Sequence, residues 1–310
     1  MRYVAGIDGG QSSTTAVIVD EAGTVVGLGS AGPADHVDQA PGSTRCADAC
    51  AAAVAAALAR AGLPRQTRIE AVVAGISGYD EGFDGAVPTL PAGRFRFAHD
   101  LPIALAGAVA TRPAVLLLSG TGSAAYGEDD LGSSVGMGGW GYLFGDEGSA
   151  YAIARDALAA AMRADDRGEQ IALTQPALDF FAASGMRALA SAALRGRISR
   201  ARLASFAPRV HDAAAAGDGD GLRIVADAAD ALASLAARTI TRLGRAGDAV
   251  AVVLAGGSFE NAAFAALVGA RLHAHAPHAE VLRPQYSAAI GAALLAFDDA
   301  GLARPPAVTG

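Results

Sequence analysis

The strongest constraint on the fold is a pattern of strands and helices that occurs twice along the chain. Each copy opens with two strands joined by a tight turn rich in glycine and hydroxyl residues, and then alternates helices with buried strands. The order in each copy is β-β-β-α-β-α-β-α. This alternation predicts largely parallel sheets that bind ligands at the carboxyl ends of their strands. We therefore predict a duplicated α/β protein with two lobes.

Apolar periodicity gives the expected elements of each copy. In the first copy we expect strands at 3–8, 15–20, 24–28, 69–75 and 94–100, and helices at 46–61 and 101–110. In the second copy, strands follow residue 114, and helical segments are expected at 147–165, 176–194, 199–214, 220–243 and 287–298. The lobes are expected at 1–112 and 113–286, with a helical insertion over about 165–243 in the second. The C-terminal helix, 287–300, is free to pack back on the first lobe.

Composition excludes several classes of protein. All 24 basic residues are arginine, and because a Walker A loop and Schiff-base chemistry both need lysine, P-loop and pyridoxal-phosphate enzymes are excluded. The net charge of −7 argues against a nucleic-acid partner, which favours a basic face. The N-terminus shows no apolar signal segment, and no apolar run is long enough for a membrane span. We expect a cytoplasmic protein without a membrane partner.

The cysteines and histidines give little support for a metal centre. Cys46 and Cys50 lie four residues apart in a predicted helix, where two small buried residues are expected, and two thiolates cannot complete a structural zinc site. His273, His275 and His278 have no carboxylate or cysteine at ligand spacing, so a solvated helix end is expected there.

Two Gly-rich turns occupy matching places in the two copies. They are "GGQSS" at 9–13 and "SGTGS" at 119–123. Backbone amides and hydroxyls in such a turn form a nest for phosphate oxygens, and glycine allows close approach. Asp8, at the mouth of the first turn, is placed to hold Mg²⁺ through water, since Mg²⁺ keeps most of its hydration shell. A single turn of this kind is ordinary hairpin chemistry, but two matching turns indicate a nucleotide site.

Four segments resemble the N-acetylglucosamine kinase branch of the actin and sugar-kinase superfamily, which shares a family with ATPases that activate benzoyl-CoA reductase. They are "DGGQSSTTAVIVD", "LSGTGSAAYG", "LAGGSFEN" and "GGWGYLFGDEGSAYAIARDAL". The resemblance implies a duplicated two-lobe actin-like (ribonuclease H-like) ATPase fold with an active-site cleft between the lobes. It also implies an ATP- and Mg²⁺-dependent kinase that phosphorylates the 6-hydroxyl of an amino sugar. N-acetylglucosamine is the first choice of substrate and glucosamine a close second.

The resemblance and the turns together assign roles to individual residues. The residues expected to contact ATP are Gly9, Gly10, Gln11, Ser12, Ser13, Gly120, Thr121, Gly122, Gly256, Gly257 and Ser258, with Gly217 a weaker candidate for the adenine pocket. The residues expected to contact the sugar are Asp35, Asp100, Gly139, Trp140, Gly141 and Asp146. The alternative for the last four is a core tryptophan, with Asp146 or Glu147 capping a helix at Ser149.

Asp100 is the expected catalytic residue. It follows a short strand and precedes a helix, where the family carries its catalytic aspartate, and would accept the proton of the sugar's primary hydroxyl. The alternative is a plain helix N-cap.

Two other functions stay open at this stage. One is a reductase-activating ATPase, but those proteins bridge an iron–sulfur cluster between subunits with cysteines near the lobe junction, where this chain has none. The other is a non-catalytic sugar or nucleotide sensor, against which the intact Asp8, Asp100 and both turns argue. A homodimer is left open.

Asp35→Asn tests the choice between the two amino sugars. In the kinases that this chain resembles, an asparagine after the third strand contacts the sugar, and Asp35 of "GPADHVDQ" takes its place. An aspartate cannot donate the amide N–H, and its charge favours protonated glucosamine. We expect the ratio of kcat/KM values to move toward N-acetylglucosamine in the variant. An unchanged ratio with unchanged KM values would mean that Asp35 only caps a loop.

Overall fold

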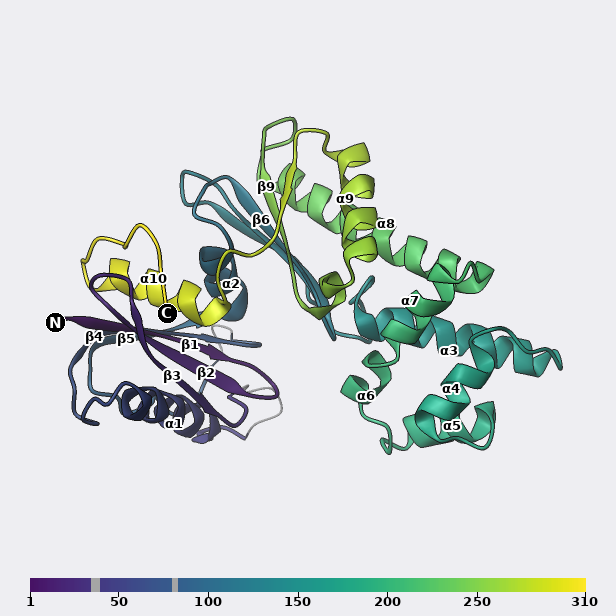
Figure 1. Ribbon diagram of the computed structural model, residues 1–310, viewed down its shortest axis with the longest axis horizontal. Helices are drawn as coiled ribbons and strands as arrows, with labels where there is room; N and C mark the ends of the chain where they lie inside the picture. The colour runs from purple at the N-terminus through teal and green to yellow at the C-terminus, as the bar shows by residue number, and fades with distance from the viewer. Residues whose placement is uncertain (35–39, 80–82) are drawn as a thin grey trace. The chain divides into compact units, whose positions relative to one another are not determined.

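The computed structural model describes residues 1–34, 40–79 and 83–310 (Figure 1). These residues form two compact units. The first comprises Met1–Thr111 and Arg283–Gly310, and the second comprises Arg112–Leu282.

The first unit is built on a five-stranded mixed sheet. Its strands are β1 (Tyr3–Gly9), β2 (Thr14–Asp20), β3 (Val25–Ala31), β4 (Ile69–Ile76) and β5 (Ala92–His99). They lie in the order β3-β2-β1-β4-β5. The three opening strands pair antiparallel, while β1, β4 and β5 are parallel. The carboxyl ends of β1 and β5 therefore lie at the same edge of the sheet.

Helices cover both faces of this sheet (Figure 1). Helix α1 (Arg45–Arg60) packs on one face, while α2 (Asp100–Ala108) and α10 (Ala288–Asp299) pack on the other. Alternate strand residues serve the two cores, because successive side chains point to opposite faces. Ile7 and Ile18 join the core under α1, and Val4 and Val19 join the core under α10.

Neither cysteine forms a disulfide, and both are buried in α1, as the sequence predicted for a pair of small core residues. The hydrogen bond between the Cys50 thiol and Cys46 raises the pKa of Cys50, and burial raises it further. A buried thiol that resists ionisation is a poor nucleophile and a poor metal ligand.

Glycines set the close approach of α10 to its neighbours. A Cβ at Gly6 of β1 would overlap backbone atoms of Ala289 and Ala293 in α10. A Cβ at Gly291 of α10 would overlap the Ile103 carbonyl oxygen and the Gly107 amide of α2. Both Gly6 and Gly291 need glycine for space, since neither has a left-handed backbone. The C-terminal helix thus packs against β1 and α2 backbone to backbone.

The second unit repeats the topology of the first. Its strands are β6 (Ala114–Ser119), β7 (Ser123–Glu128), β8 (Ser134–Gly138), β9 (Ala251–Ala255) and β10 (Glu280–Leu282). Their order, β10-β9-β6-β7-β8, is that of the first sheet with β6 in the place of β1. The pairing also matches, with an antiparallel hairpin at β6–β7 and parallel neighbours at β6–β9 and β9–β10. The predicted duplication is confirmed.

Most of the second unit's helices lie between β8 and β9. They are α3 (Ala150–Asp166), α4 (Thr174–Phe181), α5 (Met186–Leu194), α6 (Arg200–Ala204), α7 (Ala207–Ala215) and α8 (Gly219–Arg242). After β9 come a 3-10 turn, η1 (Gly257–Glu260), and α9 (Ala262–His275). One core joins α3, α8 and α9 to the sheet, with Leu117 and Val252 among its strand residues. In the described part of the chain, no helix has both the length and the hydropathy needed to cross a membrane.

Two of the helices expected from the sequence are wrong, because each is a pair of helices. The segment 176–194 breaks after α4, where Ala182 adopts a left-handed backbone with φ of 50°. The segment 199–214 breaks between α6 and α7 because Pro208 has no N–H for an Ala204 carbonyl and its ring crowds that turn. Apolar periodicity continues across both breaks, so it does not reveal them.

Gly291→Ala tests the close packing of α10. We expect the added methyl group to lower the free energy of unfolding by roughly 1–3 kcal/mol, because backbone atoms of α2 must move to admit it. Urea unfolding followed by far-ultraviolet circular dichroism measures the change. Gly219→Ala is the control, because a Cβ there meets open space on α8. Equal stability of the two variants would contradict the packing argument.

Candidate functional site

Hydrogen bonds and close packing hold the base of the first Gly-rich turn, while the side chains at its tip are exposed. The Gly10 amide donates to the Ser13 carbonyl at 3.0 Å, and the Gly10 carbonyl accepts from the Ala34 amide at 3.1 Å. Gly9 is packed so closely that a Cβ would lie 2.6 Å from Ile76. Gln11, Ser12 and Ser13 are exposed. The predicted phosphate-binding residues thus form an accessible turn on a fixed base.

Asp8 and Asp100 lie at the same edge of the first sheet. Asp8 pairs with Gly75 of β4, and Ile76 pairs with His99 at the end of β5. Burial, with repulsion from Asp100 as the second cause, raises the pKa of Asp8 to about 6. The structure therefore brings together the residue predicted to hold Mg²⁺ and the predicted catalytic base.

Asp100 is the first residue of α2, and its neighbour His99 occupies the N-cap position. The alternative that Asp100 is a plain N-cap is therefore wrong. Nδ1 of His99 lies 2.7 Å from Oδ1 of Asp100 and 3.2 Å from the Leu101 amide nitrogen. Nδ1 cannot both accept a hydrogen bond from the Leu101 amide and donate one to Asp100. The contact with Oδ1 of Asp100 is the shorter of the two, and a carboxylate oxygen this close to a ring nitrogen needs a proton between them. We therefore assign the proton to Nδ1, which donates to Asp100.

His99 was missed by the sequence reasoning. Its hydrogen bond to Asp100 raises the pKa of His99, although burial acts in the opposite direction. A histidine directly before the candidate base was a usable signal, because it can reach the carboxylate of the next residue.

The second Gly-rich turn is joined by hydrogen bonds to the segment after β8. The Ser119 hydroxyl donates to the Gly148 carbonyl at 3.0 Å, and the Ser123 hydroxyl donates to the Glu147 carbonyl at 2.8 Å. The Ser123 amide also donates to Oδ1 of Asp146 at 3.2 Å. Thr121 stays exposed at the tip. The predicted phosphate turn and a predicted sugar residue therefore form one structure within the second unit.

Asp146 has the most unusual environment of the predicted sugar residues. Its φ of 63° is left-handed, a conformation that costs a non-glycine residue about 1 kcal/mol or more. Its side chain is 4% exposed, and Oδ2 has no hydrogen-bond partner among the described residues. A Cβ at Gly122 would lie 3.0 Å from Oδ2, so glycine in the phosphate turn leaves space for the carboxylate.

Trp140 lies on the surface of the same segment. It is 76% exposed, and Gly139 and Gly141 on either side have left-handed φ values of 69° and 78° that favour glycine. The alternative of a core tryptophan is therefore wrong. Capping by Asp146 or Glu147 is also wrong, because Ser149 caps α3 by accepting from the Ala152 amide.

The segment "LAGGSFEN", residues 254–261, lies beside the second Gly-rich turn. Gly256 follows β9 with φ of 99°, and a Cβ there would overlap the Ser119 carbonyl oxygen. Gly257 and Ser258 begin the 3-10 turn η1. The Ser258 hydroxyl is buried without a hydrogen-bond partner among the described residues. These residues form a second glycine-lined surface next to the phosphate turn.

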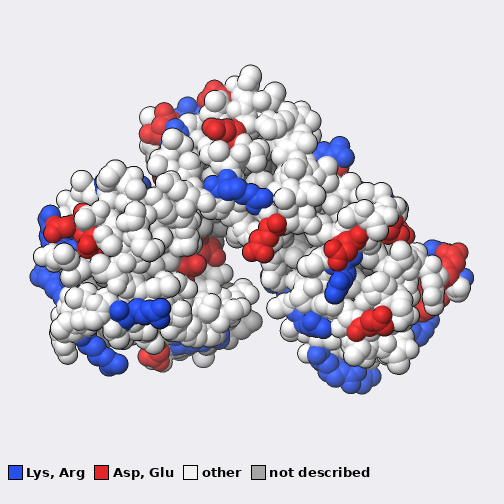
Figure 2. Space-filling view, in the orientation of Figure 1, with Lys and Arg blue, Asp and Glu red and all other residues white. Residues whose placement is uncertain are grey.

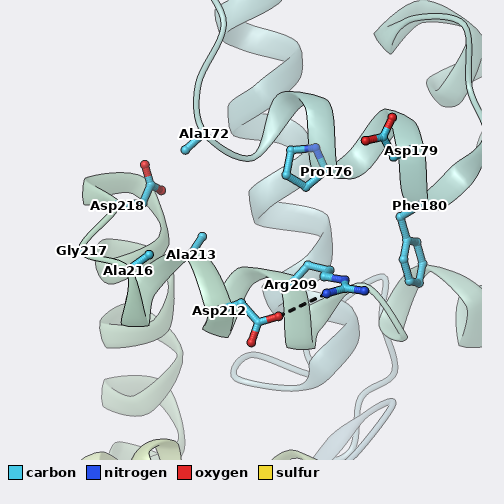
Figure 3. Close-up of a pocket in the computed structure, with 10 residues that line it drawn as sticks. All are labelled: Ala172, Pro176, Asp179, Phe180, Arg209, Asp212, Ala213, Ala216, Gly217 and Asp218. Carbon is cyan, nitrogen blue, oxygen red and sulfur yellow. Dashed lines mark hydrogen bonds and ion pairs between the residues drawn. The ribbon is translucent and has the colours of Figure 1, made fainter.

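Gly217 lines a different feature. A cavity of about 910 Å³ lies among α4, α7 and the start of α8 (Figure 3). In Figure 3, Phe180 and Asp179 of α4 stand opposite the ion-paired Arg209 and Asp212 of α7. The lining includes Gly217 but not Gly256, Gly257 or Ser258. The adenine-pocket role of Gly217 stays a prediction, and Asp35 lies outside the described residues.

Charge is dispersed on the surface. On the face drawn in Figure 2, arginine and carboxylate side chains are interspersed, and neither sign forms a continuous patch. Among residues 1–34, 40–79 and 83–310, no three His, Cys, Asp or Glu side chains gather in a metal-binding arrangement. His273, for example, uses Nε2 to contact the Ala279 carbonyl at 2.9 Å.

The model of the BadF/BadG/BcrA/BcrD ATPase family matches residues 5–296. The chain belongs to this family. A Clostridium acetobutylicum N-acetylmuramic acid/N-acetylglucosamine kinase is 34% identical over 170 residues, 54% of this chain and 56% of that protein. A Dictyostelium discoideum N-acetyl-D-glucosamine kinase is 32% identical over 188 residues, 59% of each protein. The chain thus spans somewhat more than half the length of these curated relatives.

Solved structures share the fold over nearly the whole chain. A Chromobacterium violaceum protein, whose N-acetylglucosamine kinase name is provisional, has a TM-score of 0.75 at 26% identity and covers 95% of this chain and 99% of its own. A Streptomyces griseus ROK family glucokinase in complex with glucose and AMPPNP has a TM-score of 0.57 at 18% identity, with coverage of 96% and 99%. The second likeness concerns the fold alone. The predicted two-lobe actin-like fold is confirmed.

Asp8→Asn tests the cost of the buried carboxylate. Because the folded pKa of about 6 exceeds the ordinary 3.8, the native state binds the extra proton between these values and stability falls as pH rises through that window. The difference of about two pKa units corresponds to roughly 3 kcal/mol at neutral pH. In EDTA, urea unfolding at pH 7 should show the variant to be more stable by up to that amount.

The stability gain of Asp8→Asn should shrink as the pH is lowered toward 4, because the wild-type carboxyl group is then protonated in the native state and increasingly protonated in the unfolded state as well. Asp165→Asn, an exposed change on α3, is the control and should leave stability unchanged. An Asp8→Asn protein that is less stable than wild type at pH 7 would contradict the assigned cause.

Proposed function

We propose that this protein is an ATP-dependent kinase that phosphorylates the 6-hydroxyl of an amino sugar, N-acetylglucosamine first and glucosamine second. The observation that carries the proposal is Asp146. A buried carboxylate with a strained backbone and an unused acceptor lies directly against Gly122 of a phosphate-type turn. Strain of this kind gathers at functional sites. The names of the two curated relatives support the same class of substrate.

In the first unit, Asp100 is the general base. It accepts the proton of the sugar hydroxyl, while His99 holds the carboxylate through the 2.7 Å contact. Ser12 and its neighbours bind phosphate oxygens. Most of the lowering of the barrier comes from positioning the reactants rather than from the base.

Asp8 fits the role of a Mg²⁺ ligand through water. Its carboxylate resists ionisation because it is buried and faces Asp100, and a divalent cation relieves both costs. Bound Mg²⁺ supplies neutralisation of the phosphate charge. Asp8 keeps its carboxylate at the sheet edge to orient the hydrated ion.

In the second unit, the turn at 119–123 and the Gly256–Ser258 motif bind ATP, and the segment from Gly139 to Asp146 binds the sugar. Thr121 contacts phosphate, and the Ser258 hydroxyl gains the partner that it lacks among the described residues. The exposed ring of Trp140 packs against the apolar face of a pyranose, while Oδ2 of Asp146 accepts a hydrogen bond from a sugar hydroxyl.

The other two functions are less well supported. A reductase activator needs cysteines that can hold a cluster, and both cysteines of this chain are buried in one helix. A non-catalytic sensor does not require a general base such as Asp100 beside a carboxylate that binds a cation, such as Asp8. We also propose a cytoplasmic location, where ATP and free amino sugars occur together.

A coupled ADP-release assay tests the function. The panel comprises N-acetylglucosamine, glucosamine, N-acetylmuramic acid, N-acetylmannosamine and glucose, and ³¹P NMR identifies the phosphorylated position. We expect the highest kcat/KM for N-acetylglucosamine, with the 6-phosphate as product. ATP hydrolysis that no sugar stimulates would favour the activator, and absence of any turnover would favour the sensor.

Asp100→Asn should lower kcat by about 10²-fold or more, because general-base catalysis is worth about that much. Affinity for a non-hydrolysable ATP analogue, measured by isothermal titration, should stay nearly unchanged. Asp48→Asn, an exposed change on α1, is the control and should leave both quantities unchanged. A kcat within a few-fold of wild type would remove Asp100 from the role of base.

A further inference from the structure

Helix α6 of the helical insertion brings an arginine to Asp146. Arg200 is the first residue of α6, which Ser199 caps by accepting from the Arg202 amide at 3.2 Å. Nη2 of Arg200 lies 3.8 Å from Oδ2 of Asp146. A cap on a helix that packs against α3 therefore fixes the backbone from which this side chain extends.

The Arg200 guanidinium group also lies over the ring of Tyr142. Its Cζ lies 5.3 Å from the ring centre of Tyr142, within the range of a cation–π contact. Tyr142 is in turn held edge-on by Tyr151 of α3, with ring centres 5.5 Å apart. Arg200 is therefore oriented by neighbours other than Asp146.

The Arg200–Asp146 pair has unused hydrogen-bonding capacity on both sides. A separation of 3.8 Å is too long for a hydrogen bond. Oδ2 has no hydrogen-bond partner in the described part of the chain, and Nη2 of Arg200 does not donate to it at this distance. The Arg200 side chain is 32% exposed, so a ligand can reach it. A buried acceptor and a partly exposed donor therefore lie close together without bonding to each other.

The spacing and polarity of this pair suit a bridging hydroxyl group. An oxygen beside the pair can lie about 2.8 Å from both atoms, which are 3.8 Å apart. A hydroxyl can donate to the carboxylate and accept from the guanidinium group at the same time. An ether oxygen or a fluorine can only accept, and an ammonium group can only donate.

We propose that Arg200 is a sugar-binding residue that, together with Asp146, holds one hydroxyl group of the sugar substrate. The proposal rests on the proposed kinase function and on Asp146 as a sugar contact. It gives the helical insertion a role in substrate specificity, since α6 lies far along the chain from the segment that carries Trp140 and Asp146.

Kinetics with deoxy sugars test the proposal. Kinetic constants of wild type and Arg200→Gln are compared for N-acetylglucosamine and its 1-, 3- and 4-deoxy analogues. For the parent sugar, we expect KM to rise about 10- to 100-fold in the variant, the usual size of a hydrogen bond to a charged group, with kcat within a few-fold. One deoxy analogue lacks the hydroxyl group that Arg200 holds. For that analogue, the KM of wild type should already be raised by this factor, and Arg200→Gln should not raise it further.

Two further variants separate binding from folding. Arg200→Lys keeps the charge without the planar fork and should recover part of the loss. Arg197→Gln removes an exposed arginine from the turn before α6 and should leave KM unchanged. Thermal unfolding, and titration of Trp140 fluorescence with the parent sugar, report folding and sugar affinity without turnover.

The outcomes are distinct. An equal rise in KM for every analogue means that Arg200 only maintains structure, or acts through a bound water, and overturns the proposal. Unchanged KM values overturn it as well. If wild type phosphorylates no sugar while ATP is hydrolysed, the kinase function fails first and this proposal fails with it.

Discussion

The carboxylate of Asp146 is the interaction on which the site of the second unit depends. It accepts from the Ser123 amide through one oxygen and occupies the space left by Gly122 with the other. Removing this carboxylate would leave a buried amide without its partner and an empty space under the phosphate turn. Ser119 and Ser123 strengthen the connection by donating to the backbone of the same segment. The segment that ends at Asp146–Gly148 and the Gly-rich turn at 119–123 therefore hold each other in place.

The two units share a topology but carry different chemistry on it. In the first unit the carboxyl edge of the sheet presents two acids, Asp8 and Asp100, with a histidine beside them. In the second, the matching edge presents Ser119 and the glycines that follow it, with the Gly256 turn alongside. A duplicated scaffold thus supplies two phosphate-type turns, and the residues around each turn determine what else that unit binds.

The sequence predicted the features of the fold and site that a local pattern of residues marks. Both Gly-rich turns, the duplicated succession of strands and helices, and the position of Asp100 could be predicted, because glycine, hydroxyl and acidic residues at strand ends mark them. The break at Ala182 could not, since alanine rarely takes a left-handed backbone and gives no signal. Arg200 also could not be predicted, because its pairing with Asp146 and Tyr142 depends on tertiary packing of a short helix far along the chain.

The two buried acids show why these units differ in what they require. Asp146 has an arginine 3.8 Å from its free oxygen, so the fold itself supplies a positive charge. Asp8 instead faces another carboxylate, and burial together with that repulsion raises its pKa to about 6. A neutral residue at position 8 would remove this repulsion at little structural cost, since Asp8 is the penultimate residue of β1. Its presence therefore argues that a cationic ligand offsets the cost when the protein works, whereas Asp146 already has Arg200 beside it.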